Sequence, residues 1–259
     1  MQFGNSTALI TGASGGIGEE FAVALAARGA DLILVARRAD RLEALRERLT
    51  ARHPGITVDI VTADLARPGS GAELAARVGE LNRDVDVLVN NAGIGLHGAF
   101  HTQDPEANTG AVQLNCATLV DLTARFLPAM IERRQGVVIN VASTAAFQPT
   151  PGMAVYGATK AFVLSFTEAL WHENRKTGVR ILALCPGATQ TEFFDRTGEK
   201  FMTDGRQSAT EVVDTALAAL DKSSPTVVSG VRNAILAMGY RVAPRKLLLA
   251  VSERMLRAE

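Results

Sequence analysis

A tyrosine and a lysine lie four residues apart in the stretch VYGATKAFVLSF, where Tyr156 precedes Lys160. On a helix, residues at this spacing share one face, so the phenol and the ammonium would lie side by side. A neighbouring ammonium lowers the pKa of a phenol from its usual value of about 10. A phenol that exchanges its proton near neutral pH is a general acid/base, which ketone reduction needs at the carbonyl oxygen. The alternative is a core tyrosine and a surface lysine.

Other side chains that could take part in a reaction precede this pair in the sequence. Ser143 lies thirteen residues before Tyr156, and its hydroxyl could stabilise charge on the same carbonyl oxygen; Thr144 is its neighbour. His97 and His101 are four apart, but the residues between them do not favour a helix and no third ligand is evident, so we expect no metal. No order of Ser, His and Asp along the chain supports a hydrolase.

Short apolar runs alternate with helical patterns and would position these side chains. Strands are expected at 7–11, 31–36, 56–63, 85–91, 136–143, 179–185 and 225–230, and helices at about 16–29, 38–52, 71–82, 105–134, 153–177 and 209–221. Strands that are apolar on both faces suit a parallel sheet covered by helices on both sides. The pattern predicts a single-domain α/β protein over residues 1–259, a Rossmann-type doubly wound sheet of about seven strands.

A glycine-rich turn, TGASGGIG, joins the first strand to the first helix. Gly12, Gly16 and Gly18 permit a tight turn and let a phosphate approach backbone N–H groups at the helix N-terminus. The turn lacks the G-K-[ST] ending of a P-loop, so it favours a dinucleotide over a nucleoside triphosphate.

The composition excludes several classes of protein. The 259 residues include 27 basic and 27 acidic side chains, a balance that argues against nucleic-acid binding. Hydrophobic residues make up 47% of the chain, enough for a sizeable core. Two cysteines, Cys116 and Cys185, lie in apolar segments and favour a reducing, cytoplasmic setting. We see no signal peptide, and no uncharged apolar run reaches the ~18 residues of a membrane span.

The motifs together resemble the short-chain dehydrogenase/reductase family. Its first turn reads T-G-x-x-x-G-x-G, as here, and its Y-x-x-x-K motif matches Tyr156 and Lys160. NNAG (residues 90–93) follows the fourth strand, and Pro186 and Gly187 follow the sixth. The matches occur in order at strand ends and cover roughly residues 7–192.

This resemblance implies roles for individual residues. Tyr156 would be the acid/base, Lys160 would tune it and bind the nicotinamide ribose, and Ser143 would support the oxyanion. Asn115 resembles the residue whose backbone carbonyl, on a kinked helix, holds a water in a proton relay. Asp64 resembles a residue that contacts the adenine amino group. The expected cofactor contacts are Gly12, Ser14, Gly16, Ile17, Gly18, Arg37, Arg38, Asp64, Leu65, Asn91, Ala92, Gly93, Tyr156, Lys160, Pro186, Gly187, Thr189 and Thr191.

The residues after the second strand favour NADP(H) over NAD(H). The sequence LVARRADR places Ala36, not a carboxylate, at the strand end, and Arg37 and Arg38 follow. An arginine binds a 2′-phosphate through a charge-assisted fork, whereas a carboxylate would repel it. We expect Arg37 to be the main phosphate ligand and Arg38 a helper.

We expect the substrate to be a medium-sized hydrophobic ketone, aldehyde or alcohol. Phe193, Phe194, Phe201 and Met202 lie in a segment, 192–210, that we expect to cover it. Residues 240–259 predict an amphipathic helix that packs on its own core, on a partner subunit or on a membrane surface. The resemblance implies a homodimer or homotetramer. The chain would be a carbonyl reductase. The alternatives are a 3-ketoacyl or hydroxysteroid-type reductase, a non-catalytic NADP(H) sensor, and a hydrolase or epimerase on the same scaffold.

Overall fold

Seven parallel strands form one sheet in the computed structural model, which describes residues 3–193, 205–222, 224–240 and 244–256. Their order across the sheet is β3-β2-β1-β4-β5-β6-β7. The strands are Thr7–Thr11 (β1), Asp31–Ala36 (β2), Val58–Thr62 (β3), Val87–Asn90 (β4), Gly136–Val141 (β5), Val179–Cys185 (β6) and Thr226–Val228 (β7). This confirms the predicted Rossmann-type doubly wound fold.

The central strands are buried on both faces, as their continuous apolar sequences predict. Every residue of β1 and of β5 is buried. Ile10 of β1 lies opposite Leu34 of β2 and Val89 of β4 in the register of the sheet. A one-residue shift would move these side chains to the other face, so packing on both faces holds the register.

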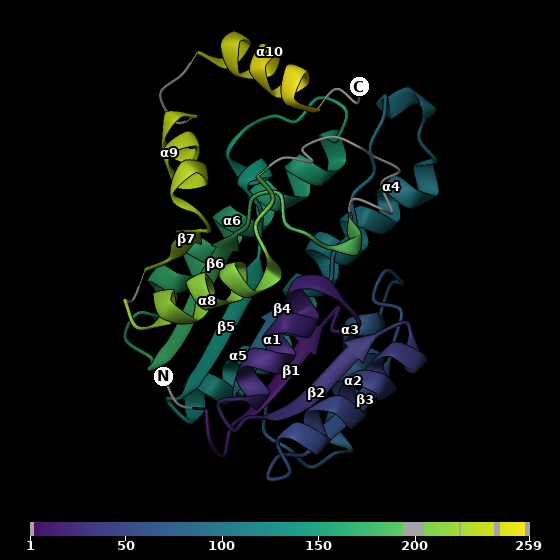
Figure 1. Ribbon diagram of the computed structural model, residues 1–259, viewed down its shortest axis with the longest axis vertical. Coiled ribbons are helices and arrows are strands. Elements are labelled where there is room, and N and C mark those ends of the chain that lie inside the picture. Colours follow the sequence, from purple (N-terminus) through teal and green to yellow (C-terminus); the bar gives the residue numbers. More distant parts are fainter. Residues whose placement is uncertain (1–2, 194–204, 223, 241–243, 257–259) are drawn as a thin grey trace.

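Helices cover both faces of the sheet (Figure 1). The helices on the described chain are Gly16–Ala26 (α1), Ala39–Arg52 (α2), Ser70–Gly79 (α3), Pro105–Val112 (α4), Leu119–Glu132 (α5), Ala154–Asn174 (α6), Ala209–Leu220 (α8), Val231–Gly239 (α9) and Arg245–Leu256 (α10). Helices α1, α2 and α8 share one apolar cluster with the sheet, whereas α3 and α5 contribute to the cluster on the other face. The core therefore has two apolar layers with the sheet between them.

The strand order reverses between β1 and β4, because the chain leaves β3 and returns to pair on the opposite side of β1. Ligands of doubly wound sheets bind beyond the carboxyl ends of the strands at such a point. The glycine turn follows β1 and Asn91 follows β4, so both lie at this point.

The predicted helix at 105–134 is divided in three: α4, a π-helical segment Gln113–Thr118, and α5. By length and composition alone, Pro105–Glu132 is apolar enough to cross a membrane. Leu122, Leu127 and Met130, however, lie in the core beneath the sheet. Packing in the core accounts for the apolar character of this stretch.

Helices α9 and α10 extend beyond the strand ends at the top of Figure 1. Sequence patterns predicted α10 within 240–259 but missed α9. On α10, Leu248 and Ser252 are buried, while Leu249 and Val251 are exposed. On α9, Val231, Ile235 and Met238 are exposed.

Candidate active site

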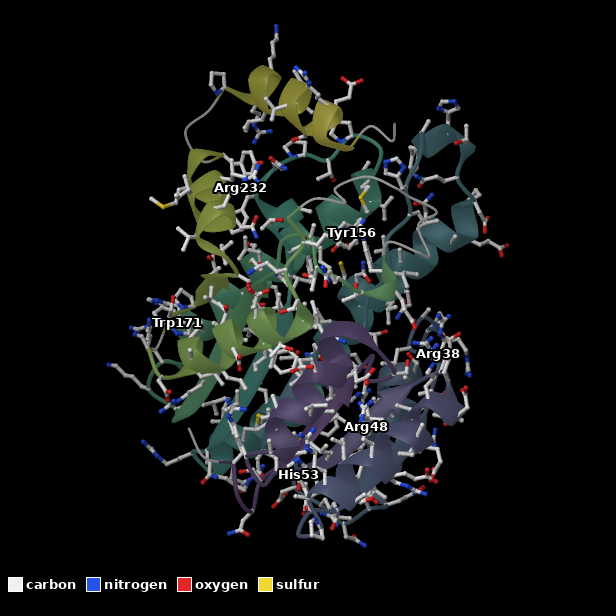
Figure 2. The ribbon with its side chains drawn as sticks, viewed as in Figure 1. Arg38, Arg48, His53, Tyr156, Trp171 and Arg232 are labelled. Atoms are coloured by element: carbon white, nitrogen blue, oxygen red, sulfur yellow. The ribbon has the colours of Figure 1, made fainter. Side chains whose placement is uncertain are left out.

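An open cleft of about 360 Å³ lies at the carboxyl ends of the strands. It is lined by the glycine turn and by the segments that follow β2, β3, β4, β5 and β6, together with α6. Of the catalytic and cofactor-binding residues predicted from sequence, all line this cleft except Gly18 and Asn115, which lie behind its wall. Figure 2 shows Tyr156 toward the α9 and α10 end of the molecule and Arg38 toward the β2 and β3 side.

The glycine turn has a backbone that side chains would disrupt. Gly12 has φ of +68°, in the left-handed region that favours glycine. A Cβ on Gly18 would lie 2.4 Å from the carbonyl oxygen of Gly12. The Asn91 amide donates to the carbonyl oxygens of Thr11, at 2.9 Å, and Gly12, at 3.3 Å. The turn is therefore fixed from below by Asn91, with the N-terminus of α1 directed at the cleft.

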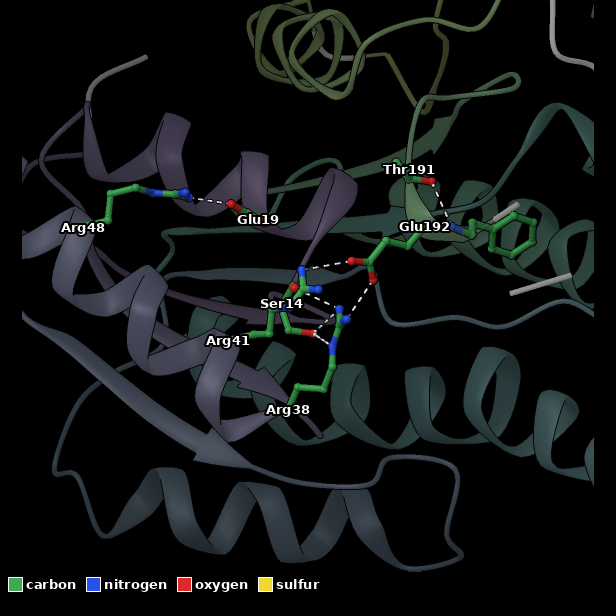
Figure 3. Close-up of polar contacts among 8 residues, drawn as sticks. Ser14, Glu19, Arg38, Arg41, Arg48, Thr191 and Glu192 are labelled. Atoms are coloured by element: carbon green, nitrogen blue, oxygen red, sulfur yellow. Dashed lines mark hydrogen bonds and ion pairs between the residues drawn. The ribbon is translucent and has the colours of Figure 1, made fainter. Parts of the chain in front are cut away.

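Arg38 is held against the glycine turn by several hydrogen bonds (Figure 3). Its guanidinium donates to the Ser14 carbonyl oxygen at 2.9 Å and to the Ser14 hydroxyl at 3.2 Å. It also forms an ion pair of 2.8 Å with Glu192. Arg37 lines the same cleft with an exposed side chain. The structure thus gives Arg38 a fixed place at the turn, although sequence reasoning assigned it the secondary role.

The Tyr156 phenol, the Ser143 hydroxyl and the Lys160 ammonium converge in the cleft. Ser143 follows β5 and lies near the phenol, and its hydroxyl oxygen accepts from the Ala145 N–H at 3.1 Å. Lys160 is 5% exposed, and its Nζ donates to the Val141 carbonyl oxygen at 2.7 Å. This Nζ lies 5.8 Å from the centre of the Tyr156 ring. The i, i+4 spacing on α6 places both groups on one face, as predicted.

The pKa of Tyr156 departs from the sequence expectation. Lys160 was expected to lower it, but burial raises the pKa of the phenol, and the hydrogen bond from Ser143 opposes that rise only in part. Burial also lowers the pKa of Lys160 to about 8, because a desolvated ammonium is less stable. Tyr156 therefore keeps its proton at neutral pH. That is the form able to donate a proton to a carbonyl oxygen.

The lowered pKa of Lys160 makes a testable contribution to stability. Between pH 8 and 10.5 the folded chain binds fewer protons at Lys160 than the unfolded chain, so stability rises with pH there. Between pH 8 and pH 10, we expect the unfolding free energy of wild type to rise relative to that of Lys160→Met by about 2 kcal/mol. Urea unfolding at each pH measures this difference; the opposing titration of Cys185, whose pKa burial raises to about 12, is present in both proteins.

Exposed Lys176 provides the control for that experiment. Stability curves of Lys176→Met and wild type should stay parallel over the same pH range. If the stability curve of Lys160→Met also ran parallel to that of wild type, burial would not destabilise the Lys160 ammonium.

Asn115 supports the cleft from within the π-helical segment. Its side-chain amide donates to the Ile94 carbonyl oxygen at 2.9 Å and to the Thr159 hydroxyl at 3.0 Å, and its oxygen accepts from the Ile94 N–H. The side chain therefore ties the loop after β4 to α6. The helix changes to π-helical winding around this residue.

Asp64 and Leu65 line the cleft beyond β3. The Asp64 carboxylate accepts a hydrogen bond from the Ala66 N–H at 3.1 Å, which caps the turn that follows. Leu65 is buried, and its carbonyl oxygen accepts from the hydroxyls of Ser70 and Thr118. Both residues thus shape the wall of the cleft on the β3 side.

The other end of the cleft, near Tyr156, is largely apolar. The Phe193 ring lies 5.2 Å from the Tyr156 ring, and Met153 and Ile94 also line this end. Gln148 contributes a buried oxygen, Oε1, that no described protein donor contacts. Of the predicted covering segment, residues 194–204 lie outside the described residues.

Sequence reasoning missed one whole element of the lining, which contributes Asn233, Leu236 and Tyr240. They belong to α9 and the residue that follows it. The apolar spacing of Val231, Ile235 and Met238 is the helical signal that could have revealed this element.

A glycine turn on a doubly wound sheet, with Ser143, Tyr156 and Lys160 in the same cleft, defines a nucleotide-dependent oxidoreductase of the short-chain class. The chain belongs to the short-chain dehydrogenase/reductase family, whose sequence profile, described as short chain dehydrogenase, matches residues 6–201. It is 35% identical over 237 residues to dehydrogenase/reductase SDR family member 7B of Bos taurus, covering 86% of this chain and 73% of that protein.

Solved structures agree with this assignment. A short-chain dehydrogenase from Sphingobium yanoikuyae in complex with NADPH superposes with a TM-score of 0.84 at 35% identity, covering 98% of each chain. The bulky-bulky ketone specific alcohol dehydrogenase from Comamonas testosteroni has a TM-score of 0.78 at 33% identity, covering 91% of this chain and 92% of that one.

Proposed function

We propose that this protein is an NADP(H)-dependent carbonyl reductase that acts on apolar ketones or aldehydes, or on the corresponding alcohols in reverse. The observation that carries the proposal is the convergence of Ser143, Tyr156 and Lys160 in the cleft that also holds the glycine turn. A cofactor bound on that turn would reach from the arginines after β2 toward Tyr156.

The side chains divide the work of carbonyl reduction. NADPH, when bound, supplies the hydride to the carbonyl carbon. Tyr156 donates its proton to the carbonyl oxygen, and the Ser143 hydroxyl stabilises charge on that oxygen as it develops. Lys160, held by the Val141 carbonyl oxygen, supports the phenolate that remains and binds the ribose of the cofactor. Asn115 keeps the segment before Lys160 in place, and we assign the proton relay to its backbone.

The positive charge beyond β2 supports NADP(H) as the cofactor. Arg37, Arg38 and Arg41 follow the strand, and no carboxylate occupies its end at Ala36. The NADPH complex of the Sphingobium relative is consistent with this preference.

Replacing either lining arginine tests the cofactor preference. We expect Arg37→Ala and Arg38→Ala each to weaken NADPH binding about tenfold, because a charge-assisted hydrogen bond to phosphate is lost. NADH binding should stay within about twofold, since NADH lacks that phosphate. Fluorescence titration with both cofactors measures the change. Equal weakening of NADPH and NADH would contradict a phosphate site.

The lining near Tyr156 supports a bulky apolar substrate. Phe193, Met153 and Ile94 provide apolar contact, and Gln148 offers one buried acceptor for a donor on the substrate. The ketone specificity of the Comamonas relative agrees with this class. A spectrophotometric screen of aryl ketones against charged keto acids, with NADPH and with NADH, tests it. We expect turnover with the aryl ketones and NADPH; turnover confined to keto acids would overturn the substrate class.

Homo-oligomerisation remains part of the proposal. Phe162 is exposed on α6 and stacks on Phe166 with ring centres 5.9 Å apart. An exposed aromatic pair on a long helix is suited to burial against a second copy.

A further inference from the structure

One carboxylate bridges Arg38, which lines the cofactor cleft, and Arg41, one turn further along α2. Glu192 Oε2 lies 2.8 Å from Arg38 Nη1, and Glu192 Oε1 lies 2.9 Å from Arg41 Nη1. Each carboxylate oxygen therefore has its own guanidinium partner. Figure 3 shows the carboxylate between the two arginines, with Ser14 beside Arg38.

This bridge crosses the cleft and lies against the glycine turn. Arg38 and Arg41 come from the start of α2, after β2, whereas Glu192 comes from the segment after β6. A Cβ on Gly15 would lie 3.8 Å from Glu192 Oε2 and 3.3 Å from Arg38 Nη2. The methyl carbon of Thr191 would lie 2.9 Å from a Cβ on Gly16. Glu192 is thus held over the backbone that would bind the cofactor phosphates.

The bridge occupies the groups that a ribose phosphate needs. A phosphate monoester binds guanidinium groups with the same fork geometry as a carboxylate, and carries a charge of about −1.5 to −2 at neutral pH. With Glu192 in place, its negative charge already offsets one of the two positive charges of Arg38 and Arg41. The side chains of Arg38, Arg41 and Glu192 are 31%, 52% and 37% exposed, so solvent weakens the pairs and makes exchange feasible.

We infer that Glu192 competes with the 2′-phosphate of NADP(H) for Arg38 and Arg41, and so sets how strongly the enzyme prefers NADP(H) over NAD(H). This inference rests on the proposed NADP(H) dependence. Binding of the phosphate exchanges one anion for another at the same two guanidiniums and releases Glu192 from the turn. Because Phe193 is the next residue and its ring packs on Tyr156, the exchange also shifts a neighbour of the catalytic phenol.

A Glu192→Gln variant tests the competition. It removes the charge of the competitor and keeps its shape. We expect the Kd for NADPH to fall about three- to tenfold, since exposed ion pairs contribute modestly, and the Kd for NADH to stay within about twofold. Isothermal titration of both cofactors gives both values. The inference is overturned if Glu192→Gln binds NADPH no more tightly than wild type, or binds both cofactors more weakly. Glu192 would then only stabilise the structure of the turn.

The chain offers a matched control in Glu19. Glu19 pairs with Arg48 between α1 and α2, and neither residue lines the cleft. Glu19→Gln should leave both Kd values unchanged. A gain in NADPH affinity shared by Glu19→Gln would count against the inference, because it would show a general effect of removing negative charge.

Cofactor binding by wild type tests the proposed NADP(H) dependence, whereas binding by Glu192→Gln tests the competition. A wild type that binds NADH as tightly as NADPH contradicts the proposed cofactor preference. If Glu192→Gln nevertheless gains affinity for NADPH alone, the competition stands and has suppressed the preference. If wild type prefers NADPH and the variant binds it unchanged, the proposed function survives and the competition is wrong.

Discussion

Tyr156→Phe is expected to reduce kcat for ketone reduction by about 10²- to 10⁴-fold, the range for loss of a positioned general acid. The phenol keeps its proton at neutral pH, because burial raises its pKa, and it can therefore donate that proton to a carbonyl oxygen. Phenylalanine retains the ring that packs 5.2 Å from Phe193, so the cleft keeps its shape. Stopped-flow measurement of NADPH oxidation, with the best ketone from the screen, gives the rate.

NADPH affinity distinguishes loss of the general acid from loss of cofactor binding. Fluorescence titration should show that Tyr156→Phe binds NADPH within about fivefold of wild type, since losing one contact to the ribose costs at most about 1 kcal/mol. Ser143→Ala should lower kcat less, by about 10²-fold, because it removes one donor to the oxygen. A Tyr156→Phe variant with unchanged turnover would exclude Tyr156 as the acid. Retained NADPH binding without turnover in the wild type would favour a cofactor sensor.

Gly18→Ala is expected to destabilise the fold by about 1–3 kcal/mol, the cost of overpacking a tight site. The new Cβ would lie 2.4 Å from the Gly12 carbonyl oxygen and 2.5 Å from the Asn91 amide nitrogen. Both are fixed parts of the glycine turn, so the turn has to move. NADPH affinity should fall by more than about tenfold, equivalent to about 1.4 kcal/mol, because the phosphate-binding backbone moves with it. Thermal unfolding and cofactor titration measure the two effects.

Gly79→Ala is the matched control for this variant. Gly79 ends α3, and a Cβ there would meet nothing within 4 Å. Alanine favours a helix over glycine, so stability should be equal or slightly higher and NADPH binding unchanged. If Gly18→Ala were as stable as wild type and bound NADPH equally well, the close approach of α1 to the turn would not matter for cofactor binding.

Much of the fold followed from the sequence because its strands are apolar on both faces. Such a run admits few alternatives, and the predicted strand 31–36 coincides with β2. Helix α9 was missed because it follows directly on a short strand, and its N-terminus is Gly230, at φ +85°, without a side-chain cap. The division of 105–134 depends on a π-helical segment that apolar spacing does not reveal.

For the site, sequence reasoning located residues but not their electrostatics. Spacing on α6 placed Tyr156 and Lys160 on one face, yet it could not show that burial raises the pKa of the phenol. The pairing of Arg38 with Glu192 joins residues 154 positions apart, a separation at which neither residue type predicts the other. Folding of the chain after β6 back onto the glycine turn creates that contact.

Hydride transfer can be followed with NADPH that carries deuterium at C4 of the nicotinamide, with the label on each face in a separate sample. This measurement tests whether the protein is a carbonyl reductase. Mass spectrometry of the alcohols formed from a panel of aryl ketones reads the label. We predict one deuterium on the carbinol carbon from one face only, and incorporation of the label about 10²- to 10⁴-fold more slowly with Tyr156→Phe. Tight NADPH binding by the wild type, with no deuterium in any alcohol from either face, would contradict the account of this protein as a carbonyl reductase.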